Sequence, residues 1–101
     1  MSLEITKSVE GTSLILTLNG RLDTITSQEF DKEFAASALG VKEVTLDFAG
    51  LEYISSAGLR SLLKAKRSFG DGPIKIIHAN EVIKNVFAIS HFSDHIPIED
   101  D

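Results

Sequence analysis

Between residues 44 and 77 the chain changes from a strand pattern to a helix pattern and back to a strand pattern. The run Val44–Phe48 alternates apolar and polar side chains with the period of two that is typical of a half-buried strand. Apolar residues recur at helical spacing from Leu59 to Phe69, and Gly70 then marks a helix end. The apolar run Ile74–Ile77 follows. A strand, a helix and a strand in this order predict parallel strands joined by a right-handed crossover, so the predicted fold class is α/β.

The rest of the chain adds elements on both sides of this unit. Thr26-Ser27-Gln28-Glu29 has the Thr-x-x-Glu form of a capping box, and Asn80 can cap a later helix. The further predicted elements are hairpin strands at residues 3–9 and 14–18 around a turn at 10–12, helices at about 26–38 and 82–89, and a short edge strand near Ile96 and Ile98. One domain over residues 1–101 with a mixed β-sheet is therefore predicted.

Two adjacent hydroxyls lie where the strand pattern gives way to the helix pattern, in the segment Tyr53-Ile54-Ser55-Ser56-Ala57-Gly58-Leu59-Arg60. Either serine falls at the N-cap or in the first turn, where free backbone N–H groups and the helix dipole favour negative charge. A serine that only caps a helix contributes about 0.5–2 kcal/mol. The other interpretation is a phosphorylated switch, because a phosphate adds about −1.5 to −2 charges and three acceptor oxygens.

This junction, within residues 46–60, and the segment Leu18-Asn19-Gly20-Arg21-Leu22-Asp23 resemble the corresponding parts of the STAS domain family. The resemblance covers nearly the whole chain and is strongest to the stand-alone bacterial anti-sigma-factor antagonists. Residues 46–60 are the more specific part. The resemblance implies a STAS domain over residues 1–101, with a β-sheet core and helices packed mainly on one side.

The resemblance also implies that the phosphoacceptor is the serine two residues before the motif glycine, which is Ser56 before Gly58. Ser55 replaces the family's usual acidic residue and is an alternative acceptor, and Ala57 stands where many members have Ser or Thr. In such systems the unphosphorylated antagonist binds a serine-kinase anti-sigma factor, and a PP2C-like phosphatase reverses the phosphorylation. The predicted partner-binding residues are Asp23, Ser55, Ser56, Ala57, Gly58, Leu59 and Arg60.

Two of these residues keep alternative interpretations. Asp23 matches a recurrent aspartate of the family and could assist phosphotransfer or docking, or it could cap a turn near Thr24 and Thr26. Gly58 could let a partner backbone approach the helix start, or it could pack the helix against the sheet.

An enzyme is not predicted, because no nucleophile and base arrangement is recognisable. The rival functional hypothesis is a constitutive STAS subunit of a lipid-transport or other signalling assembly, in which Ser56 would only be a cap. No cofactor or metal is predicted. The chain has no cysteine, and His91 and His95 have metal-compatible spacing only if their segment is helical, so a solvated tail is favoured.

The overall charge limits the kinds of partner. A net charge of −5 and a pI near 5.1 argue against direct binding to nucleic acid or to an anionic membrane, since both reward clustered Lys and Arg. The sequence lacks a signal-peptide pattern and any run of about 20 apolar residues, so no membrane insertion is predicted and we expect a cytoplasmic protein.

Overall fold

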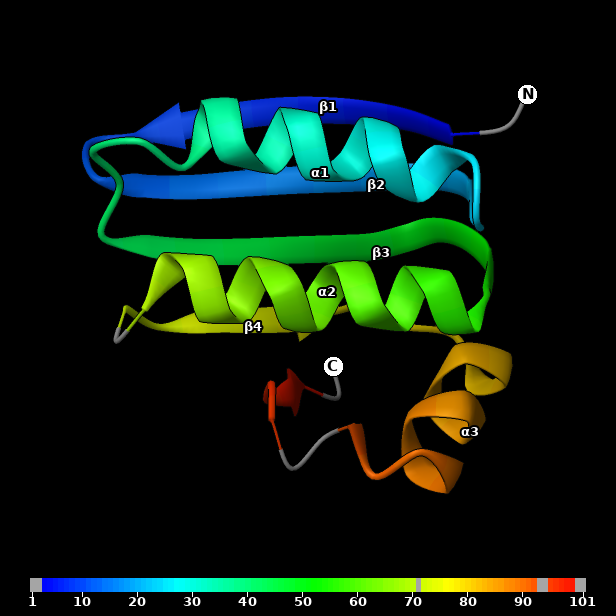
Figure 1. Cartoon of the computed structure of the whole chain (residues 1–101). Helices are drawn as coiled ribbons and strands as arrows, with labels where there is room; N and C mark the ends of the chain where they lie inside the picture. The colour runs from blue at the N-terminus through cyan, green and yellow to red at the C-terminus, as the bar shows by residue number, and fades with distance from the viewer. Residues whose placement is uncertain (1–2, 71, 93–94, 100–101) are drawn as a thin grey trace.

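A five-stranded mixed β-sheet forms the body of the protein (Figure 1). The structure is a computed structural model, and it describes residues 3–70, 72–92 and 95–99. Its elements are β1 Leu3–Glu10, β2 Ser13–Leu22, α1 Thr26–Ser37, β3 Glu43–Ile54, α2 Ser56–Phe69, β4 Ile74–Ile77, α3 Glu81–Ile89 and β5 Ile98–Glu99.

The strands lie in the order β1-β2-β3-β4-β5, which is also their order in the sequence. β1 is antiparallel to β2, and each of the other neighbouring pairs is parallel. Helices α1 and α2 connect β2 to β3 and β3 to β4, and both lie on the same face of the sheet, while α3 lies near its β4–β5 edge (Figure 1). The predicted α/β fold with helices mainly on one side is confirmed.

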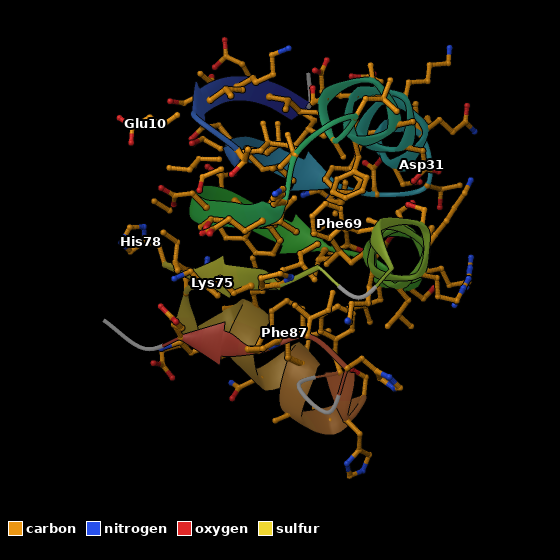
Figure 2. All side chains as sticks on the ribbon, turned by 90° about the vertical axis from the view of Figure 1, so that its left-hand side faces the viewer. Glu10, Asp31, Phe69, Lys75, His78 and Phe87 are labelled. Carbon is orange, nitrogen blue, oxygen red and sulfur yellow. The ribbon has the colours of Figure 1, made fainter. Side chains whose placement is uncertain are left out.

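The two faces of the sheet differ because side chains alternate along each strand. On β2 the residues Leu14, Leu16 and Leu18 are fully buried beneath the helices, where they meet the phenylalanines of α1. The intervening Ile15 remains 37% exposed on the other face. Figure 2 shows His78 and Lys75 on that open face, away from α1 and α2.

Strands β2 and β3 extend beyond their predicted ends, Leu18 and Phe48. The extensions pair with one another, with Gly20 beside Leu51 and Leu22 beside Ile54, and the register shifts twice along them. The side chain of Asn19 lies over Gly50, where any Cβ would collide with it. These extensions contain polar residues and glycines, so the sequence does not identify them as strands. They are strands because the partner strand satisfies their backbone hydrogen bonds.

The predicted capping box at Thr26–Glu29 is wrong. Thr26 is already inside α1 and almost fully buried, and its hydroxyl donates a hydrogen bond of 2.7 Å to the carbonyl oxygen of Arg21. The predicted cap of α3 is confirmed, because Asn80 Oδ1 accepts a 2.9 Å hydrogen bond from the Ile83 N–H.

The histidine pair near the C-terminus does not meet the helical condition for a shared metal. Helix α3 ends at Ile89, so His91 and His95 do not share a helix, and Asp94 between them lies outside the described residues. The edge strand predicted here is confirmed as the short β5, which Ile96 precedes as a buried residue.

The burial pattern of β2 predicts that substitutions of two adjacent residues lower the free energy of unfolding by very different amounts. Leu16→Ala should lower the free energy of unfolding by about 2–5 kcal/mol, because it leaves a cavity under the helices. Ile15→Ala, on the open face, should cost less than about 1 kcal/mol. Urea unfolding of both variants measures this, and equal losses would contradict the assignment of the two faces.

Candidate functional site

The junction of β3 and α2 gives its two serines different environments. Ser55 is the N-cap of α2: its Oγ accepts a 3.2 Å hydrogen bond from the Gly58 N–H, and its own N–H donates to the Leu22 carbonyl oxygen at 2.9 Å. Ser56 is the first residue of the helix and is exposed, and no group in the described part of the chain hydrogen-bonds its hydroxyl. The Ser55 hydroxyl oxygen is therefore used in the fold, while the Ser56 hydroxyl faces solvent.

Gly58 is buried where α2 crosses the end of β2. A Cβ at this position would lie 2.7 Å from the Leu22 carbonyl oxygen and 2.8 Å from Ile54 Cγ1, closer than real Cβ contacts. The interpretation that Gly58 packs the helix against the sheet is confirmed. This close approach lets α2 begin immediately after β3.

Asp23 holds the start of α1 on the neighbouring loop. Its Oδ1 accepts hydrogen bonds of 3.0 Å from the N–H groups of Ile25 and Thr26. The interpretation of Asp23 as a cap is confirmed. The bond from the Thr26 N–H is the main cause that lowers the pKa of this carboxyl below its ordinary value, because it stabilises the charged form.

The two motif segments form one surface at the carboxyl ends of β2 and β3. Because Leu22 pairs with Ile54, the residues that follow these strands, Asp23 and Ser55, begin neighbouring loops. The Arg21 guanidinium lies 4.2 Å from the centre of the Tyr53 ring, and Arg21 Nε is 4.0 Å from Asp23 Oδ2. This contact of Arg21 with Tyr53 was not predicted from the sequence, because only the register of the two strands brings these residues together.

The remaining predicted site residues lie in the first two turns of α2. Ala57 and Leu59 are half-buried, and Arg60 is exposed. Ile25, in the loop that Asp23 holds, is 74% exposed and was also missed. A lone isoleucine in a polar segment gives no sequence signal of its own, so its exposure is found only in the fold.

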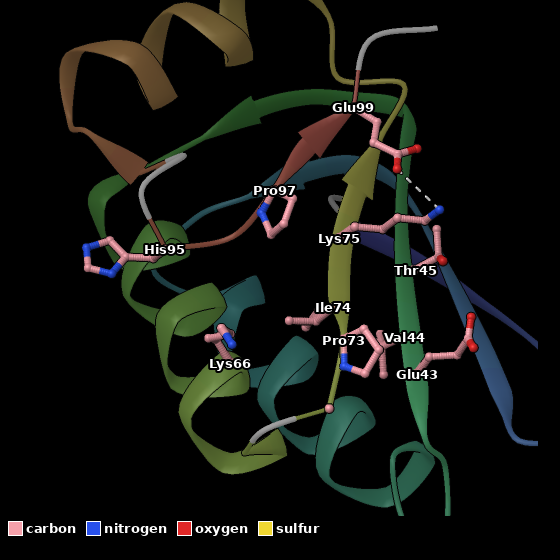
Figure 3. A pocket seen from close by; sticks show the side chains of 11 residues that line it. Glu43, Val44, Thr45, Lys66, Pro73, Ile74, Lys75, His95, Pro97 and Glu99 are labelled. Carbon is pink, nitrogen blue, oxygen red and sulfur yellow. Dashed lines mark ion pairs between the residues drawn. The ribbon is translucent and has the colours of Figure 1, made fainter.

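A shallow pocket of about 630 Å³ lies at the opposite end of the sheet, where β3 and β4 begin (Figure 3). Its lining includes Lys66, Lys75, His95 and Glu99, and Lys75 Nζ pairs with Glu99 Oε2 at 3.4 Å. None of the predicted site residues lines this pocket. Within residues 3–70, 72–92 and 95–99, no three His, Cys, Asp or Glu side chains come together as metal ligands. The same residues contain no helix that is both long and apolar enough to cross a membrane.

The packing of Gly58 gives a direct test of the junction. Gly58→Ala should lower the free energy of unfolding by about 1–3 kcal/mol through overpacking, although alanine is the better helix former. Ser56→Ala, on the exposed side of the same turn, should change it by less than about 0.5 kcal/mol. Denaturant unfolding measures both, and a stabilised Gly58→Ala protein would contradict the close approach.

The lowered pKa of Asp23 predicts a pH-dependent contribution to stability. The ionised carboxylate stabilises the fold above the pKa of the unfolded chain, near 3.8, and this contribution is lost as the pH falls through the lower pKa of the folded state. The melting temperature of Asp23→Asn should therefore lie below that of the wild type at pH 7, and the gap should close below about pH 3.8. Thermal melts from pH 7 to pH 2 measure the gap, and one that widened in acid would contradict this role.

Comparison with known proteins gives consistent results for the whole chain and for its fold. The STAS domain model matches residues 1–101. A Bordetella bronchiseptica protein, BtrV, which is named as an anti-sigma factor antagonist, is 32% identical over 88 residues, a match that covers 84% of this chain and 76% of BtrV.

Solved structures agree on the fold. The crystal structure of an anti-sigma factor antagonist from Mycobacterium paratuberculosis has a TM-score of 0.87 at 14% identity, covering 96% of this chain and 85% of that one. Unphosphorylated SpoIIAA, from Bacillus, has a TM-score of 0.83 at 16% identity, covering 97% of this chain and 88% of SpoIIAA. The full-length family match and the identity to BtrV show that this chain belongs to the STAS domain family.

Proposed function

We propose that this chain is an anti-sigma-factor antagonist that exchanges partners when Ser56 is phosphorylated. The observation that carries the proposal is the state of Ser56, an exposed hydroxyl without a hydrogen bond in the described part of the chain, on the first residue of a helix that Ser55 already caps. The name of BtrV supports the antagonist role, and SpoIIAA, which shares the fold, has structures in phosphorylated and unphosphorylated form.

Phosphorylation at this position need not disturb the fold. Ser56 is exposed, so a phosphate adds volume only on the solvent side, where the helix dipole favours its negative charge. A partner that covers the helix start would meet about two added charges without matching donors. The complex would then lose a few kcal/mol, which is about 100-fold in affinity.

The proposed cycle has two protein partners. A serine-kinase anti-sigma factor binds the unphosphorylated chain and phosphorylates Ser56, and a PP2C-like phosphatase removes the phosphate. Ser55 is the less favoured acceptor, because it is half-buried and its hydroxyl oxygen forms the helix cap. Asp23, Ala57, Leu59 and Arg60 are the proposed contact residues, and Gly58 positions the helix start.

We propose that the protein acts in the cytoplasm by binding its partners, without catalysis and without a cofactor. Anti-sigma factor antagonists of the STAS family are generally non-enzymatic. The net charge of −5 makes direct contact with DNA unfavourable, so any effect on transcription would pass through the sigma factor.

The test separates the two serines. Extract from the native cells, with labelled ATP, should phosphorylate the wild-type chain and Ser55→Ala but not Ser56→Ala, and fragmentation of the product should place the phosphate on residue 56. The kinase purified by this activity should bind Ser56→Ala as tightly as the wild type. Ser56→Asp should bind at least about 10-fold more weakly, because it places a charge in the interface.

Ser55→Ala is the matched control, since it removes the cap and lowers the free energy of unfolding by about 1 kcal/mol but leaves the proposed acceptor in place. Equal kinase binding by Ser56→Ala and Ser56→Asp would refute the switch. Stable copurification with membrane-associated components, with Ser56 unmodified in every growth condition, would favour the constitutive subunit instead.

A further inference from the structure

Helix α2 has a charge opposite to that of the chain as a whole. It carries Arg60, Lys64, Lys66 and Arg67 and no acidic residue, although the chain has a net charge of −5. Arg60, Lys64 and Arg67 are exposed, and they continue along the outer side of the helix from Ser56. Ser56, the proposed phosphoacceptor, therefore lies at the N-terminal end of a row of exposed cationic side chains on α2.

Within this row Arg60 is the cation placed to meet a group on Ser56. The two residues are separated by four positions, so they are neighbours on one face of the helix. Long side chains on a helix prefer rotamers that point back toward its N-terminus, so the Arg60 guanidinium can reach a group on Ser56. In the described part of the chain no carboxylate lies within ion-pair distance of Arg60.

The other nearby cations are already engaged. Lys64 Nζ lies 3.7 Å from Asp31 Oδ2 of α1, and it is a further turn away from Ser56. Arg21 lies over the Tyr53 ring and beside Asp23. Asp23, which follows β2, and Glu52, an exposed residue of β3, are carboxylates near this end of the sheet, and a carboxylate repels a phosphate, which increases the need for a counter-charge.

We propose that Arg60 is a shared counter-charge: it pairs with the phosphate on Ser56 in the phosphorylated chain and with a carboxylate of the partner in the unphosphorylated chain. The second half rests on the proposed function. An arginine can bind either anion through two parallel N–H groups, but it cannot bind both at full strength. Phosphorylation would thus add charge to the interface and also withdraw the cation that the partner uses.

The first experiment tests the phosphate pair without any partner. The chain is synthesised with phosphoserine at position 56. The phosphorus NMR shift is then measured as a function of pH, and its midpoint gives the second pKa of the phosphate. The arginine favours the dianion, so Arg60→Gln should move the midpoint, near pH 6, upward by about 0.2–0.4 pH unit. Arg67→Gln, about 16 Å from Ser56 along the axis of α2, is the matched control and should leave the midpoint unchanged. An unchanged midpoint in Arg60→Gln, or a larger change in Arg21→Gln, would overturn the inference.

The second experiment tests the partner's carboxylate with the kinase purified by its activity on Ser56. Arg60→Gln should weaken binding of the unphosphorylated chain by about 10-fold, and Arg67→Gln should not. Equal binding by both variants would overturn this half of the inference. Failure of the proposed function would appear as the absence of such a kinase, and it would leave the result of the NMR titration unaffected.

Discussion

The hydrogen bond from the Ser55 N–H to the Leu22 carbonyl oxygen, at 2.9 Å, joins the three elements on which the candidate site depends. It connects the end of β2 to the turn between β3 and α2. Gly58 then passes so close to the same carbonyl oxygen that no side chain fits there. Because this junction uses the hydroxyl oxygen of Ser55 and the inner face of Gly58, Ser56 is left on the outside.

The same end of the sheet also places the start of α1 beside the start of α2. Parallel strands that are joined by helices on one face bring successive helix starts to one edge. Ser27 and Ser61 are small enough for the helices to come close, and the Ser61 hydroxyl lies 3.5 Å from the Ser27 carbonyl oxygen. The ionised carboxylate of Asp23 and the exposed Arg60 in the second turn of α2 then lie at the same edge of the sheet, so the charge there has contributions from both loops.

The order and type of the elements could be predicted because each has its own periodic pattern. The hairpin, the helix that ends at Phe69 and the strand Ile74–Ile77 are examples. The parts of β2 and β3 beyond Leu18 and Phe48 could not be predicted, because their hydrogen bonds come from each other and not from a local pattern. The capping-box motif at Thr26 was misleading for a related reason: its hydroxyl bonds the carbonyl oxygen of Arg21, which the turn at Asp23 brings within reach.

The sequence by itself determined that two serines stand at the start of a cationic helix, and that a strand precedes them. Both follow from the spacing of neighbouring residues. Only the tertiary structure decided that Ser55 is the cap and Ser56 is exposed, that Asp23 holds the start of α1, and that Arg21 lies on Tyr53. These outcomes depend on the register between β2 and β3 and on burial, which arise from contacts between residues far apart in the chain.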